Sequence, residues 1–146
     1  MREILFRGKS VNDGEWVFGS LVITTLEPVD DAPIKHYHIE DMTIGCFPNE
    51  FQSGISETVD PNTVGQFTGL TAHGKKIFED DIVVICYETD GEDFSETKRV
   101  FYDAEDCCWY PMRWEERCER CDYYTEVKSI EVIGNIHNNP ELLEVE

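Results

Sequence analysis

The longest apolar run in this sequence is short, and it constrains the fold more than any other feature. The run covers residues 82–87 (IVVICY), six residues, whereas a helix that spans a bilayer needs about 20. It does not alternate with polar residues, which is typical of a strand covered on both faces or curling through a small barrel. Asp90 and Gly91 follow it with turn chemistry. We therefore expect strands, and no membrane span.

Other segments repeat this pattern of short strands between turn residues. Residues 4–6 and 16–23 predict a first hairpin around the turn at 12–14 (NDG). Residues 27–33 (EPVDDAP) predict a loop, because prolines favour neither strand pairing nor helix. Such spacing predicts a mainly β protein built as a barrel or sandwich, while residues 42–56 give no clear prediction. Further short strands are predicted at residues 36–40, 66–68, 98–102, 107–110 and 127–133.

The charge of the chain is strongly acidic. It holds 31 Asp and Glu against 12 Lys and Arg, a formal net charge of −19, yet its 40% of apolar residues is too many for a disordered chain. Binding to phosphates or nucleic acid is not expected, since such proteins cluster Lys and Arg. Residues 79–126 alone hold 16 acids and 5 bases, a net of −11. This stretch is either a solvated surface or one that recruits a basic partner or imitates DNA.

Four cysteines raise the question of a metal site. Cys107 and Cys108 are adjacent, and Cys118 and Cys121 form a C-x-x-C motif, so Cys108, Cys118 and Cys121 are candidate zinc ligands. In the alternative that we favour, Trp114, Cys118 and Cys121 form one stripe of a two-turn helix, and the thiols are buried as small apolar groups. A redox or disulfide role is the third possibility.

A second metal candidate is the alternation of residues 36–40. In a strand His36, His38 and Glu40 share one face, which could bind a divalent metal. A solvated polar face is the interpretation we favour, because Tyr37 and Ile39 supply the apolar face of the same strand.

Glu79, Asp80 and Asp81 form the only dense carboxylate cluster beside a confidently predicted strand. Such a cluster could bind Mg²⁺ in a nuclease, but consecutive side chains diverge. We therefore predict turn residues exposed to solvent. The sequence holds no G-x-S-x-G, P-loop, G-x-G-x-x-G or H-E-x-x-H motif, and we assign no catalytic residue and no cofactor.

The C-terminal segment predicts a helical turn. Asn139 suits an N-cap, Pro140 the first helical position and Glu141 the first turn. His137 lies among asparagines that could hold a ligand, but turn and cap chemistry explains this composition better. The asparagines in question are Asn135, Asn138 and Asn139.

Four stretches carry a resemblance to a known family. They are residues 6–10 (FRGKS), 16–21 (WVFGSL), 58–83 (TVDPNTVGQFTGLTAHGKKIFEDDIV) and 130–143 (IEVIGNIHNNPELL). Together they resemble the YopX-like family of phage and prophage proteins. The resemblance implies an SH3-like barrel in the C-terminal part and no transferable activity. Most YopX-like sequences carry Gly where this chain has Asp80, so a positive φ there would be strained.

We thus expect a mainly β protein with an N-terminal β lobe at residues 1–57, a C-terminal SH3-like barrel at 58–146, and short helical segments. It would be a cytoplasmic accessory phage or prophage protein in a bacterial host, acting through protein–protein contacts rather than catalysis. The expected partners are a second copy, in a homo-oligomer, and a basic host or phage protein. The alternative is a metal-dependent hydrolase or nuclease. The candidate partner-binding residues are Glu115, Glu116, Glu119 and Asp122.

Overall fold

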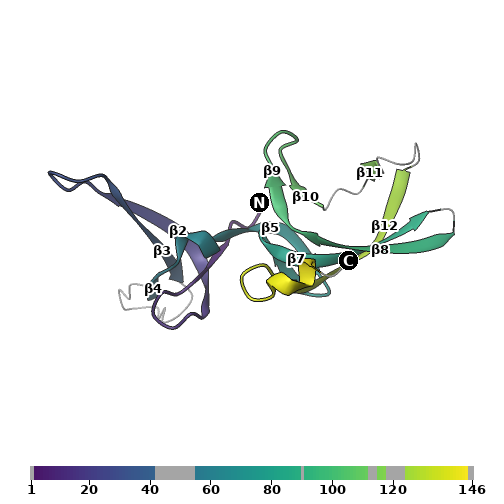
Figure 1. Ribbon diagram of the computed structural model, residues 1–146, viewed down its shortest axis with the longest axis horizontal. Coiled ribbons are helices and arrows are strands. Elements are labelled where there is room, and N and C mark those ends of the chain that lie inside the picture. Colours follow the sequence, from purple (N-terminus) through teal and green to yellow (C-terminus); the bar gives the residue numbers. More distant parts are fainter. Residues whose placement is uncertain (1, 42–54, 90, 112–114, 118–123, 145–146) are drawn as a thin grey trace. The chain divides into compact units, whose positions relative to one another are not determined.

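The computed structural model describes residues 2–41, 55–89, 91–111, 115–117 and 124–144. Its elements are strands and two short 3₁₀ turns, arranged in antiparallel sheets, so the predicted mainly β fold is confirmed (Figure 1). None of the described sheets closes into a barrel. The chain divides into two compact units, residues 1–67 and 68–146. No helix in the described ranges is long and apolar enough to cross a membrane.

The first unit is an antiparallel sheet in the order β4-β3-β2-β1-β5. Its core holds Ile39, Val59 and Phe67, all nearly inaccessible to solvent. The predicted first hairpin is confirmed, since β1 pairs with β2 around a turn in which Gly14 takes a φ of 72°. The loop predicted at residues 27–33 is confirmed as well. The strands of this unit are β1 (Phe6–Lys9), β2 (Trp16–Leu26), β3 (Ile34–Asp41), β4 (Ile55–Thr58) and the beginning of β5 (Gly65–Ala72).

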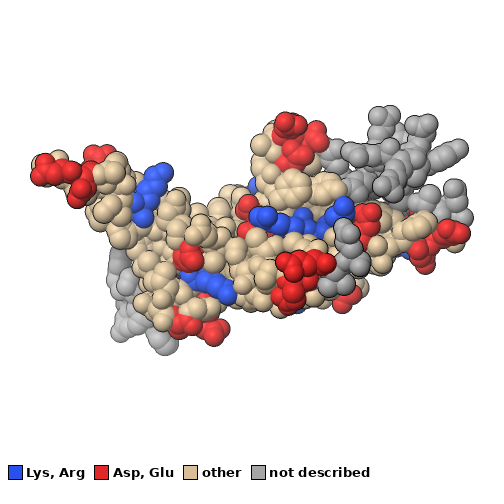
Figure 2. Space-filling model, in the orientation of Figure 1, with Lys and Arg blue, Asp and Glu red and all other residues tan. Residues whose placement is uncertain are grey.

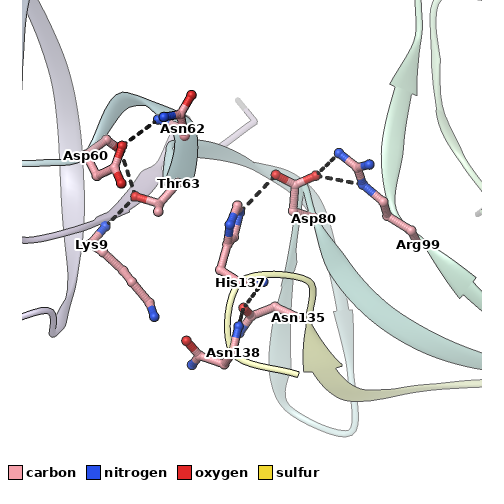
Figure 3. A network of polar contacts seen from close by, with 9 residues as sticks. All are labelled: Lys9, Asp60, Asn62, Thr63, Asp80, Arg99, Asn135, His137 and Asn138. Carbon is pink, nitrogen blue, oxygen red and sulfur yellow. Dashed lines mark hydrogen bonds and ion pairs between the residues drawn. The ribbon is translucent and has the colours of Figure 1, made fainter. Parts of the chain in front are cut away.

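A short 3₁₀ turn, η1 (Pro61–Thr63), closes this sheet at one end (Figure 3). The side chain of Asp60 caps it by accepting a hydrogen bond from the backbone nitrogen of Asn62 at 3.0 Å. The hydroxyl of Thr63 accepts from the backbone nitrogen of Lys9 at 2.8 Å and donates to the Asp60 carbonyl at 2.7 Å. These bonds tie η1 to β1 and pair the hydroxyl of Thr63, the buried residue of the turn.

The second unit holds a four-stranded sheet in the order β11-β12-β7-β8 and two smaller hairpins. Strand β7 is central and largely buried, as the apolar run predicted. The core cluster contains Ile77, Val83, Ile85, Tyr87 and Val100, against which Trp109 packs. The elements are β6 (Lys75–Phe78), β7 (Asp81–Thr89), β8 (Glu92–Arg99), β9 (Phe101–Asp103), β10 (Cys108–Tyr110), β11 (Glu115–Arg117), β12 (Tyr124–Asn135) and η2 (Pro140–Leu143).

Two predictions for this unit need correction. The helix expected around Trp114, Cys118 and Cys121 is wrong at Glu115–Arg117, which form β11 and pair with β12. The three residues of the stripe themselves lie outside the described residues. The single strand expected at residues 98–102 is two strands, because the chain leaves β8 at Val100 before β9 begins.

Candidate functional site

Asp80, in the tight turn between β6 and β7, makes polar contacts with several parts of the second unit. Its φ is 69°, so the positive φ implied by the family resemblance is present in this non-glycine residue. Its backbone nitrogen donates to the carbonyl of Val100 at 2.9 Å, and its carbonyl accepts from the nitrogen of Ile136 at 3.0 Å. Two segments distant in sequence therefore hold the strained turn in place.

The carboxylate of Asp80 joins a cation and an imidazole (Figure 3). Arg99 donates to its Oδ1 from Nε at 2.9 Å and from Nη2 at 2.6 Å. The Nε2 of His137 lies 3.1 Å from the other oxygen, Oδ2. The exposed fractions of the side chains are 11% for Asp80, 16% for His137 and 50% for Arg99. Both carboxylate oxygens are thus engaged, and only the guanidinium reaches well into solvent.

The turn after β12 presents His137 to this carboxylate. The side-chain oxygen of Asn135 accepts hydrogen bonds from the backbone nitrogens of His137 at 3.1 Å and Asn138 at 3.0 Å. A side chain at Gly134 would meet the Asn139 amide oxygen at 2.6 Å, so η2 packs closely there. The turn chemistry predicted for these asparagines is confirmed, and so is a helical turn at Pro140, but Asn139 makes no side-chain cap hydrogen bond.

The acidic cluster next to β7 is not the solvent-exposed turn that the sequence predicted. Asp80 and Asp81 are buried, at 8% and 2% exposure, and Glu79 is half-buried. The Oδ2 of Asp81 accepts from the backbone nitrogen of Phe78 at 2.8 Å, which closes the β6–β7 turn. As predicted, the consecutive carboxylates diverge, because Asp80 faces Arg99 and His137. The prediction of exposure was wrong because polar backbone and side-chain partners make burial favourable.

The histidines of β3 lie in the first unit. His36 and His38 occupy a strand as predicted, and their rings stack with centroids 6.2 Å apart. The Nδ1 of His38 lies 3.4 Å from the hydroxyl of Thr58 on the neighbouring strand. Among the described residues, no group of three or more His, Cys, Asp or Glu side chains is placed to hold a metal ion, Glu40 included.

The other predicted site residues are only partly placed. Cys107 is exposed in the β9–β10 turn and Cys108 begins β10, whereas Cys118 and Cys121 lie outside the described residues. The same holds for Glu119 and Asp122. Glu115 and Glu116 belong to β11, at one edge of the four-stranded sheet.

Many of the exposed acidic side chains in the described residues lie at the ends of three hairpins. Figure 2 shows carboxylates over the end of the β2–β3 hairpin, over the β9–β10 turn and over the end of the β7–β8 hairpin. On the last of these, the amine of Lys128 contacts Asp93 at 2.7 Å and Glu88 at 2.8 Å, and these carboxylates raise the pKa of that amine above its ordinary value. The exposed acids at the three ends are Glu27, Asp30, Asp31, Glu88, Glu92, Asp93, Glu105 and Asp106.

Comparison with known proteins identifies the lineage. The family model described as YopX protein matches residues 5–144, nearly the whole chain, so the chain belongs to the YopX family. No curated protein and no solved structure matches it. The lineage is therefore established by sequence, while the Asp80 network and the acidic hairpin ends come from the structure alone.

Proposed function

We propose that this member of the YopX family is an accessory phage or prophage protein that recruits a basic partner protein through its acidic hairpin ends. The observation that supports this most is the distribution of carboxylates. Acids at the hairpin ends face solvent, while Asp80 and Asp81 are buried and bonded inside the fold. Many of the acids available for contacts therefore lie at the hairpin ends, while others, such as Glu131, Glu141 and Glu144, are exposed elsewhere.

Such a distribution favours encounter with a positively charged surface. Clustered charge of one sign raises association rates by tenfold to about a thousandfold at low salt. The attraction acts over about 8 Å at physiological ionic strength, so an approaching partner interacts first with the carboxylates at the hairpin ends. A nucleic-acid-binding protein is one such partner, and binding to it would amount to imitation of DNA.

The proposal includes Glu115, Glu116, Glu119 and Asp122 as partner-binding residues and places the protein in the bacterial cytoplasm. It also includes self-association through sheet edges, because β8 is an exposed edge strand of the described sheet and unpaired edges invite pairing. The SH3-like arrangement of residues 58–146 belongs to the proposal in the same way, with β7 as its first long strand. The aromatic hairpin β9–β10 adds apolar surface, since Phe101 and Tyr102 are more than two-fifths exposed.

Partner capture followed by a kinetic titration tests the function. Proteins retained from host lysate would be identified by mass spectrometry, purified, and their association rates measured between 0.1 and about 1 M salt, where the Debye length falls from about 10 to about 3 Å. A hairpin-end variant combines Glu92→Gln, Glu105→Gln and Asp106→Asn. Its matched control removes the same number of exposed carboxylates elsewhere, with Glu131→Gln, Glu141→Gln and Glu144→Gln.

At low salt we expect the hairpin-end variant to associate at least about tenfold more slowly than the control, with the difference lost at high salt. Equal rates for the two variants at every salt concentration would reduce the acidity to a solubility feature. Retention of stoichiometric metal by the purified protein, with cleavage of nucleic acid or an ester substrate, would replace the proposal by the hydrolase alternative.

A further inference from the structure

Residues 23–37, which we call the β2–β3 arm, extend beyond the core of the first unit. β1 pairs with β2 only as far as Gly19, and β4 pairs with β3 only from His38 onward. Between these limits the described strands pair with each other alone, from Ile23 opposite Tyr37 to Leu26 opposite Ile34 (Figure 1). A two-stranded ribbon without a third strand or a covering helix is marginally stable in water.

The arm is exposed and yet apolar. Every residue from 23 to 35 is exposed to solvent. Four of them are large apolar residues, with exposed fractions of 49% for Ile23, 56% for Leu26, 99% for Val29 and 49% for Ile34. Single exposed apolar residues are ordinary, but a group of them on one protruding element marks a contact surface.

Two of the four apolar residues share one face of the arm and Val29 lies at its end, whereas Ile23, opposite Tyr37, lies on the other face. Leu26 and Ile34 lie directly opposite each other, so their side chains share a face of the ribbon. His36 and His38, two and four residues further along β3, stack on the same face. Val29 sits in the connecting loop beyond the last strand pair. The result is a narrow apolar strip that ends in a fully exposed valine.

The charges of the arm select the chemistry of its partner. Glu27, Asp30 and Asp31 flank Val29, and Lys35 is the one basic residue between positions 23 and 37. An acidic end disfavours nucleic acid and anionic membrane surfaces, which repel carboxylates. It also disfavours a second copy of a chain whose formal net charge is −19. A protein surface with Lys and Arg around an apolar depression complements both features.

We propose that the β2–β3 arm inserts Leu26, Val29 and Ile34 into an apolar groove on a partner protein whose rim carries Lys and Arg. The inference rests on the proposed function, of which it names the contact element. Apolar side chains buried at the centre of an interface carry most of its affinity, whereas rim charges chiefly set the rate of association. The arm would therefore hold the complex that the acids help to form.

Site-specific cross-linking in the full-length protein tests the contact first. A photoreactive amino acid would be placed at position 29 and, as a control, at position 133, where Ile133 is 39% exposed in the second unit. The cross-linked species would be identified by mass spectrometry after irradiation in the host cell. The identified protein would then be purified and titrated with the variants described below.

Leu26→Thr combined with Ile34→Thr removes the two apolar side chains of the strip and places threonine, a β-branched strand former, at both positions. We expect the dissociation constant to rise at least about tenfold, chiefly through faster dissociation. The matched control, Leu70→Thr combined with Ile133→Thr, removes two exposed apolar strand residues of the second unit and should bind as wild type. Amide hydrogen exchange in β1 and β5 verifies that the first unit remains folded in each variant.

The outcomes separate the arm from the general proposal. If the hairpin-end variant loses binding but the Leu26 and Ile34 variant binds with wild-type affinity, the proposed function stands. The proposal that the arm contacts the partner is then overturned. If binding requires Leu26 and Ile34 but its rate does not change with salt or with the hairpin-end variant, the contact through the arm stands and recruitment by charge is overturned. A cross-link from position 29 to a second copy of the chain, to nucleic acid or lipid, or to no protein overturns the inference.

Discussion

Replacing Asp80 by alanine should destabilise the second unit by about 2 kcal/mol, the sum of two lost contacts. A Cβ in the left-handed region costs about 1 kcal/mol relative to glycine, but aspartate and alanine both carry one at a φ of 69°, so this strain cancels between them. The hydrogen bond to His137, whose side chain is 16% exposed, contributes about 1.5 kcal/mol as a bond to a charged group in a partly buried site. The pair with Arg99 contributes only about 0.5 kcal/mol, because the arginine is 50% exposed and solvent screens it.

Asp80→Gly separates the backbone from the carboxylate. Glycine loses the same contacts to Arg99 and His137 but accepts a φ of 69° without strain. Relief of about 1 kcal/mol of strain offsets half of the lost contacts, so we expect a net cost of about 1 kcal/mol. The expected order of stability is wild type, then the glycine variant, then the alanine variant. This order is opposite to that in a strand interior, where glycine is the worse residue.

Amide hydrogen exchange measures the effect locally, which matters because a chain of two units need not unfold in one step. The amide nitrogens of Val100 and Ile136 donate to the carbonyls of Asp81 and Asp80, so their protection reports the turn directly. Glu131→Ala, an exposed position of β12, is the control and should change stability by less than about 0.5 kcal/mol. Equal protection in the alanine and glycine variants, or less in glycine, would refute the strain argument.

Three further predictions test other parts of the structure. Gly19→Ala should lower the hydrogen-exchange protection of β2 and β3 by an amount equivalent to about 1–3 kcal/mol, because the added Cβ would meet the backbone carbonyl of Glu40; unchanged protection would contradict this packing. Lys128 should be acylated more slowly at pH 9 in wild type than in an Asp93→Asn variant, because Asp93 and then Glu88 raise the pKa of its amine and keep it protonated; equal rates would contradict the paired geometry. Light scattering should show a mass of at least twice the 16.9 kDa of one chain at high concentration, and a single-chain mass throughout a hundredfold dilution series would set self-association aside.

The predictions from sequence succeeded where a pattern is local. Alternation, the apolar run and the turn residues identified the first hairpin and the strand at β7. The position of Asp80 in a strained turn also followed from the local resemblance. These features depend on residues a few positions apart, which a sequence displays directly.

The partners of Asp80 could not be read in the same way. Arg99 is 19 residues away in sequence and His137 is 57 residues away, so no local pattern joins them. From the sequence alone, a turn with two carboxylates is expected to be exposed, because burial requires polar partners that the local sequence does not show. The helical stripe at residues 114–121 failed at β11 for a related reason, because pairing with β12 overrides the weak helical preference of a short segment.

The burial of Asp80 and Asp81 also changes how the acidity of the chain acts. Their carboxylates are bonded internally, so the net of −11 counted over residues 79–126 overstates the charge that faces solvent. The exposed acids at hairpin ends carry the outward field, which decays within about 8 Å in physiological salt. A partner within about 8 Å of Asp30 and Asp31 is attracted by their carboxylates. At that distance it can also contact Val29, the most exposed large apolar residue described. Long-range attraction and apolar contact therefore coincide on the β2–β3 arm, within seven consecutive residues from 27 to 33.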